Sequence, residues 1–233
     1  MFYGYGFDKY YLMLVVPAFL FSLYAQFRVK GAFSKYSKYT NTRGITGAEM
    51  SRYILKMNDI SDVDVVPTGG SLTDHYDPRT KVVRLSETVF SSTSIAAIGV
   101  AAHETGHALQ HNEKYGPLAL RSSLVPVAGI GSSVGPYLAI FGLFLGSDLL
   151  LNAGLILFTL AVAFYLVTLP VEFNASSRAV AMLGKSQLFS EEEIKPVKKV
   201  LSAAAMTYVA SAAVAMASLL RLILLANSRK NND

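Results

Sequence analysis

Four long stretches without a charged residue constrain this chain more than any other feature of its sequence. They cover residues 10–27, 122–147, 149–171 and 200–220, and each contains between 18 and 26 residues. A helix needs about 20 apolar residues to cross the roughly 30 Å of hydrocarbon in a bilayer. Lipid offers no partner for backbone polar groups, so such stretches cross as helices. We therefore expect a mainly α-helical membrane protein with four transmembrane helices.

The first stretch, residues 10–27, also suits a second interpretation, namely a cleaved signal peptide. Its flanks argue against this, because the charges of Asp8 and Lys9 cancel before the apolar run, whereas a signal peptide carries net positive charge there. The sequence near Tyr24 and Gln26 also lacks a small-residue cleavage site. We expect this stretch to remain as the first membrane helix.

The positive charge of the chain is concentrated directly after this first helix and indicates the orientation in the membrane. Residues 28–48 contain five cations and no acid, which equals the net charge of +5: Arg28, Lys30, Lys35, Lys38 and Arg43. Positively charged loops stay in the cytoplasm. We therefore expect a multi-pass protein of the cell membrane, with its N-terminus outside and residues 28–121 and 172–199 in the cytoplasm. Three cations near the C-terminus oppose this orientation, because four crossings place them outside: Arg221, Arg229 and Lys230. The five cations of residues 28–48 outnumber these three, so we keep the orientation.

The pI near 9.3 is also typical of nucleic-acid-binding proteins. The sequence argues against that class, because the basic residues adjoin a membrane helix and no stacking aromatic residues are interleaved through a folded domain. We expect the basic stretch to fix the topology and to contact anionic head groups of the lipid bilayer. No nucleic-acid partner is expected, and the sequence leaves the oligomeric state open.

Residues 28–121 have the composition of a small globular α+β domain. Thr46 and Glu49 form a capping-box pattern that opens a helix. Residues 63–66 predict a short strand ended by Pro67, and residues 71–76 and 81–86 predict a β-hairpin around a turn at residues 77–80. Ser94 ends a serine-rich cap for a long helix over residues 95–112. The second cytoplasmic segment, residues 172–199, predicts a helix continuing from the third membrane helix and another capped at Ser190.

The long helix over residues 95–112 carries the pattern His103-Glu104-x-x-His107. Two histidines four residues apart stand one turn above the other, so both imidazoles reach one ion, with the glutamate beside the first. The chain has no cysteine, which leaves histidine and carboxylate as its strong metal ligands. This pattern predicts a catalytic site with one Zn²⁺ per chain and Glu104 as general base.

A catalytic zinc ion needs a third protein ligand, which must come from elsewhere in the chain. Glu172 is the favoured candidate, because it follows the third uncharged stretch on the side of the membrane that also holds the histidines. Asn174, Ser176 and Arg178 follow it at helical spacing and form a polar face suited to orienting ligands. Four further candidates stay open as third ligand or as neighbours of the site: His111, Asp74, His75 and Asp77.

Two strings that contain these residues, 102–111 and 170–179, together with four membrane helices, resemble the YugP-type family of neutral zinc metallopeptidases along essentially the whole chain. More distantly, the sequence is similar to the HtpX and CAAX prenyl-protease gluzincins. The resemblance implies a zincin-like domain, zinc on His103, His107 and Glu172, and Glu104 as catalytic residue. The distant group has an aspartate where this chain has Ser176. We therefore expect Asn174 or Asp77 to help orient the histidines.

The expected function is that of a zinc metalloendopeptidase that cleaves peptides, membrane proteins or membrane-proximal segments. Arg178 is the first candidate to stabilise the oxyanion, with His75 and Tyr76 as alternatives. One rival function is a non-enzymatic, zinc-stabilised membrane scaffold. Another is a site-two-type intramembrane protease, which the sequence disfavours because residues 88–102 are too polar to span a bilayer and no later Asp-Gly ligand motif follows.

Overall fold

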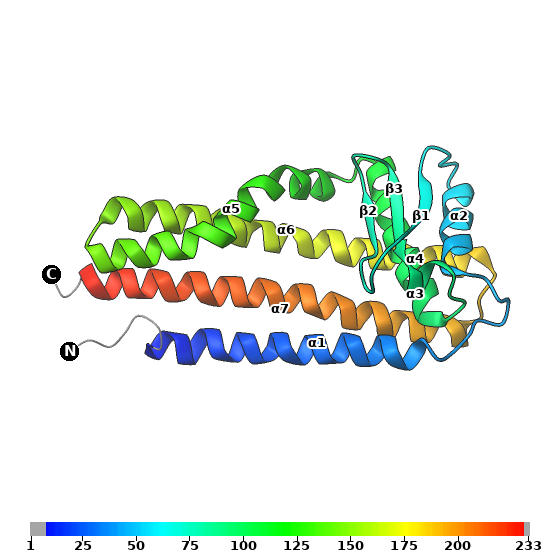
Figure 1. Cartoon of the computed structure of the whole chain (residues 1–233), viewed down its shortest axis with the longest axis horizontal. Helices are drawn as coiled ribbons and strands as arrows, with labels where there is room; N and C mark the ends of the chain where they lie inside the picture. The colour runs from blue at the N-terminus through cyan, green and yellow to red at the C-terminus, as the bar shows by residue number, and fades with distance from the viewer. Residues whose placement is uncertain (1–7, 231–233) are drawn as a thin grey trace. The chain divides into compact units, whose positions relative to one another are not determined.

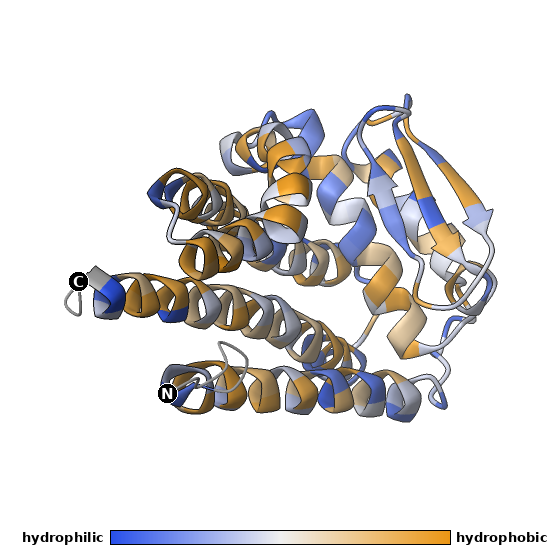
Figure 2. Cartoon of the chain, turned by 60° about the vertical axis from the view of Figure 1, so that its left-hand side comes forward, coloured by the Kyte–Doolittle hydropathy of each residue, from blue (hydrophilic) through white to orange (hydrophobic). Residues whose placement is uncertain are grey.

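The computed structural model describes residues 8–230 and is mainly helical, with one small sheet (Figure 1). Within this part of the chain, four helices are long and apolar enough to cross a membrane: Tyr11–Tyr36, Gly116–Leu145, Asp148–Ser186 and Glu191–Arg229. Apolar residues extend along much of these helices (Figure 2). The expected mainly α-helical chain with four candidate membrane helices is thus confirmed.

The long helices extend well beyond the uncharged stretches of the sequence. The first consists of a π-helical turn η1 (Tyr11–Val15) followed by α1 (Val16–Tyr36), and the others are α5 (Gly116–Leu145), α6 (Asp148–Ser186) and α7 (Glu191–Lys230). Helix α6 continues past the third stretch, as expected. Ser190 and Glu193 form the predicted capping box at the start of α7, with Glu193 N–H donating to Ser190 Oγ over 3.3 Å.

The described chain divides into two compact units. The helical unit comprises residues 8–26, 119–170 and 207–230, and the mixed unit comprises residues 27–118 and 171–206. In the helical unit, Gly131, Gly135 and Gly142 of α5 face α6 so closely that a Cβ on any of them would collide with its backbone. Small residues let membrane helices approach in this way. These glycines therefore serve tight helix packing.

Besides parts of α1, α6 and α7, the mixed unit contains three further helices and the sheet. The helices are α2 (Gly47–Met57), α3 (Glu87–Phe90) and α4 (Ile95–Asn112), and the strands are β1 (Asp64–Thr68), β2 (His75–Asp77) and β3 (Val82–Ser86). The strand order is β1-β3-β2, with β1 parallel and β2 antiparallel to β3. Met50 and Ile54 of α2, Leu85 of β3 and Ile98 of α4 share one buried core. Helix α4 has the bounds expected from the sequence, and Ser94 caps it by accepting from Ala97 N–H.

Two expectations about the strands were wrong. The first strand does not end at Pro67 but includes it, because β1 is an edge strand and the missing N–H of proline faces no partner there. The second strand is only His75–Asp77, shorter than residues 71–76 suggested. Gly70 and Leu72 adopt positive φ angles, which interrupt an extended strand. The Asp74 side chain accepts hydrogen bonds from Ser86 N–H and Oγ, in place of the backbone hydrogen bonds of a longer strand.

Candidate metal centre

Helix α4 holds both histidines of the pattern on a side that faces α6. Its first half, including Ile95 and Ile98, is buried in the core of the mixed unit. Near the histidines, Gly106 lies so close to α6 that a Cβ at this position would stand 2.7 Å from the carbonyl oxygen of Ala175. Glycine at this place in the pattern therefore lets α4 approach the segment of α6 that carries Glu172.

Three metal-ligating side chains meet where the two helices cross. The Oε2 atom of Glu172 lies 3.2 Å from His103 Nε2 and 3.6 Å from His107 Nε2. One ligand atom from each of the three residues falls within 4.8 Å of the others. The three side chains are 12%, 10% and 2% exposed for His103, His107 and Glu172.

This arrangement fits a zinc ion. Ligand atoms on one tetrahedral zinc ion, at about 2.0–2.2 Å from it, lie roughly 3.3–3.6 Å from each other. The observed carboxylate–imidazole separations agree with that spacing. A carboxylate buried like that of Glu172 is costly unless a cation or metal compensates it. The donor set of two imidazoles and one carboxylate is also that of known catalytic zinc sites.

Each histidine is oriented by a second partner on its other ring nitrogen. Ser176 Oγ lies 3.1 Å from His103 Nδ1, and Gln110 Oε1 lies 3.0 Å from His107 Nδ1. Such partners fix the ring and the tautomer of a metal-binding histidine. Ser176 thus contacts one histidine of the cluster, and Gln110 contacts the other.

A chain of polar contacts continues outward from His107. Gln110 Nε2 donates to Val171 O over 2.8 Å and to Asn174 Oδ1 over 2.9 Å. The same Asn174 oxygen accepts from Arg178 Nε over 2.7 Å. Arg178 also forms a bidentate pair with Glu113, at 2.6 and 2.7 Å. The pair holds the pKa of the Glu113 carboxyl below its usual value.

Gln110 and Glu113 were missed by the sequence reasoning, although both lie within or just after the helix that carries the motif. A weak signal was available for Gln110, which lies one turn from His107. Arg178 was considered first as an oxyanion stabiliser. In the structure its guanidinium binds Glu113 and Asn174, so that this side chain links α6 to the C-terminal end of α4.

The other candidate side chains lie on or beside β2. Tyr76 OH lies 2.7 Å from His111 Nδ1. Burial, followed by the charges of Asp62 and Asp77, raises the pKa of Tyr76 to about 12, so its hydroxyl stays protonated at neutral pH. His75 is exposed, and its Nδ1 contacts the carbonyl of Thr73.

The two aspartates that were considered as alternatives to Glu172 have structural partners. Asp77 accepts from Arg79 N–H and Thr80 Oγ1 in the hairpin turn, and these hydrogen bonds lower its pKa to about 2. Asp74 binds Ser86. Neither aspartate, nor His75 or His111, belongs to the cluster formed by His103, His107 and Glu172.

Glu104, the glutamate of the pattern, is partly buried on α4. It lies close enough to His107 for its charge to act on that ring. Burial lowers the pKa of His107, but its hydrogen bond to the Glu172 carboxylate and the charges of Glu104 and Glu172 outweigh this effect, and the net shift is upward. Glu104 itself lies outside the cluster of three ligand residues.

Comparison with known proteins agrees with this centre. The sequence profile described as "Putative neutral zinc metallopeptidase" matches residues 11–227. The "Putative membrane protease YugP" of Bacillus subtilis (strain 168) is 51% identical over 223 residues, which cover 95% of this chain and 99% of that protein. No solved structure shows significant similarity. With its four apolar helices the chain is a multi-pass membrane protein, and it belongs to the family of neutral zinc metallopeptidases that this profile describes.

Proposed function

We propose that this protein is a zinc metalloendopeptidase that hydrolyses peptide bonds in membrane proteins or membrane-proximal segments. The observation that carries the proposal is the cluster of His103, His107 and Glu172, whose ligand atoms lie within 4.8 Å of one another. Zinc bound by these three residues supplies a Lewis acid that lowers the pKa of water towards 7 and polarises a carbonyl. The proposed location is the cell membrane, with the site on the cytoplasmic side.

The residues around the centre have different roles in the proposed reaction. Glu104 takes the proton from the attacking water and passes it to the leaving amine. Ser176 and Gln110 hold the rings of His103 and His107 in the orientation that exposes Nε2 to the metal. We assign Arg178 a positioning role, since its guanidinium pairs with Glu113.

The strand β2 offers a place for the substrate backbone. It pairs with β3 on one side only and contacts α4, the helix of the histidines. An extended peptide added along such an edge gains main-chain hydrogen bonds. Tyr76 projects from this strand, remains protonated because of its raised pKa, and forms a pair with His111. We propose this pair as the donor that stabilises the oxyanion.

The substitution Glu104→Gln separates zinc binding from catalysis. The purified variant is expected to keep one zinc per chain by elemental analysis and to lose peptide hydrolysis, because glutamine has no proton-accepting carboxylate. Glu192→Gln, at an exposed position on the first turn of α7, serves as the control and keeps full activity. Undiminished hydrolysis by Glu104→Gln would overturn the mechanism. Zinc binding by the wild type without hydrolysis of any substrate would indicate the scaffold function instead.

The substrates can be identified by comparing the membrane proteomes of cells that carry Glu104→Gln and of wild-type cells. Fragments of membrane proteins are expected to disappear in the variant strain, with cleavage sites in segments next to the bilayer. Cleavage sites mapped inside membrane-spanning segments would favour an intramembrane protease and contradict the proposed location of the reaction.

A further inference from the structure

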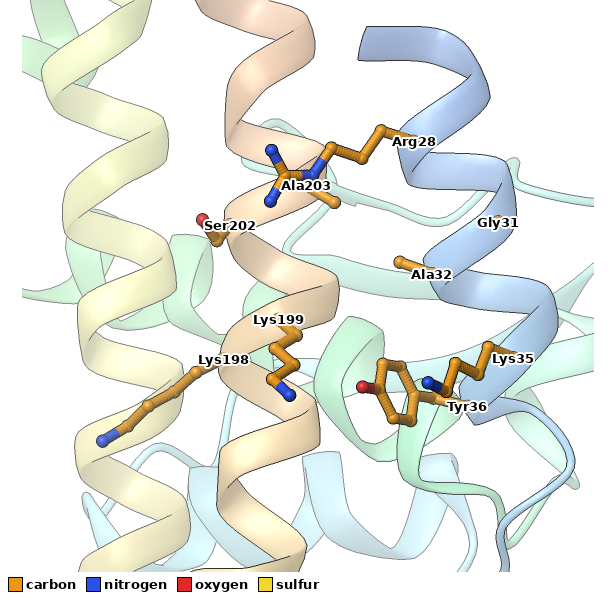
Figure 3. A pocket seen from close by; sticks show the side chains of 9 residues that line it. All are labelled: Arg28, Gly31, Ala32, Lys35, Tyr36, Lys198, Lys199, Ser202 and Ala203. Carbon is orange, nitrogen blue, oxygen red and sulfur yellow. The ribbon is translucent and has the colours of Figure 1, made fainter. Parts of the chain in front are cut away.

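A basic cavity of about 440 Å³ lies between α1 and α7 in the mixed unit (Figure 3). Its lining includes four cations and two hydroxyl groups, and no carboxylate: Arg28, Lys35, Lys198, Lys199, Tyr36 and Ser202. It is separate from the metal centre and shares no residue with it. A hollow that is lined by several cations and by no acid indicates a site for an anion.

The side chains converge from two helices. Arg28 and Lys35 are seven residues apart and therefore share one face of α1. Arg28 reaches α7, where its guanidinium lies 4.0 Å from Met206 Sδ. The Lys199 ammonium and the Tyr36 hydroxyl point towards each other across the gap, whereas Lys198 extends to the other side of α7 (Figure 3).

The cavity lies where both helices change from apolar to basic. Arg28 directly follows the uncharged stretch of residues 10–27, and Lys199 directly precedes that of residues 200–220. If these stretches cross the hydrocarbon layer, the cations that border them lie at the level of the lipid phosphates. Basic pockets between membrane helices at this level bind anionic head groups.

We propose that this cavity binds the phosphate of an anionic phospholipid head group. Arg28, Lys35 and Lys199 compensate its charge, and the hydroxyls of Tyr36 and Ser202 donate to its oxygens or to the glycerol of the head group. The site differs from diffuse attraction by the basic stretch of residues 28–43, because it requires α7 as well as α1. Gly31 also lines the cavity, and a Cβ there would meet no atom within 4 Å, so a larger side chain at this position has room to occupy the space.

Three variants of the full chain separate a pocket from diffuse attraction. Lys35→Gln/Lys199→Gln removes two cations of the pocket. Lys30→Gln/Lys38→Gln removes the same charge from exposed positions in the basic stretch that do not line it. Gly31→Leu keeps every charge and fills the hollow. Unfolding midpoints in lipid-free detergent establish that each variant is folded.

Native mass spectrometry of these proteins with phosphatidylglycerol or phosphatidylcholine measures the binding. The wild type is expected to retain one phosphatidylglycerol in preference to phosphatidylcholine. A basic residue near the membrane surface contributes about fivefold to the affinity, so Lys35→Gln/Lys199→Gln should weaken phosphatidylglycerol binding about 25-fold. Gly31→Leu should also lose the retained lipid, and Lys30→Gln/Lys38→Gln should keep it.

Two outcomes would overturn the proposal. Equal losses in the two lysine pairs, with Gly31→Leu unaffected, would show diffuse attraction. Displacement of phosphatidylglycerol by an equal concentration of inorganic phosphate would assign the cavity to a soluble phosphate compound rather than to a lipid. Hydrolysis by the protease does not enter any of these measurements, so the result is independent of the proposed activity.

Discussion

At the scale of single residues, the two neighbours Ser176 and Ser177 of α6 offer a matched comparison. Ser176 contacts the ring of His103, whereas Ser177 is exposed. Loss of a partner that orients a metal-binding histidine costs about 10–100-fold in metal affinity. We expect Ser176→Ala to weaken zinc binding to this extent in a chelator competition, and Ser177→Ala to leave it unchanged. Equal affinities of both variants would contradict the role given to Ser176.

The pair between Glu113 and Arg178 predicts a pH dependence of stability. Because the folded state depresses the pKa of Glu113, the stabilisation is present above the carboxyl's unfolded pKa, about 4.3, and is lost as pH falls through the lower folded value. The unfolding midpoint of the wild type should therefore exceed that of Glu113→Gln at neutral pH, and the difference should shrink below about pH 4. A difference that grows on acidification would refute this sign.

At the scale of elements, the crossing of α4 and α6 rests on Gly106. An alanine there would press its Cβ against the Ala175 carbonyl, so α6 must move and carry Glu172 and Ser176 with it. We expect Gly106→Ala to cost about 1–3 kcal/mol of stability and to weaken zinc binding. Gly184→Ala is the control on α6, because its Cβ would meet no atom within 4 Å. Zinc affinity of the Gly106 variant equal to that of the control would disprove the tight crossing.

The elements that the sequence predicted best depend on neighbours in the chain. The capping boxes at Thr46 and Ser190 and the bounds of α4 follow from side chains three or four residues apart. The strand β1 was misjudged because the tolerance of Pro67 depends on the order of strands in the sheet.

In the candidate site, too, the sequence predicted the features that depend on neighbouring residues and missed the contacts between distant ones. The spacing of His103 and His107 is visible in the sequence, and the change from apolar to polar residues pointed to Glu172. Gln110 and Glu113 have partners 64 and 65 residues away, at Asn174 and Arg178, and local sequence carries no signal for such pairs. The ion pair of Arg178 with Glu113 was likewise beyond reach, since a guanidinium near a metal motif suits an oxyanion and an ion pair equally.

At the scale of the whole molecule, the predicted orientation can be tested by labelling, since the chain contains no cysteine. Single cysteines at Ser61 and Glu192 should react with a membrane-impermeant maleimide only after the cells are permeabilised. A cysteine at Ser147, in the short connection between α5 and α6, should react in intact cells, because the predicted orientation places this connection outside. The reverse pattern would place the metal centre outside the cell and overturn the proposed sidedness.

One series of contacts runs from His107 through Gln110, Asn174 and Arg178 to Glu113. It limits the positions at which related proteins can gain or lose residues. Each added or deleted residue turns the rest of a helix by about 100°. One such change between residues 103 and 113, or between 172 and 178, would turn some members of the set away from their partners at once. Insertions in the bends at residues 69–74 or 146–147 do not rotate any of these residues relative to the others on its own helix. We therefore expect insertions and deletions among related proteins to occur mainly in those two bends.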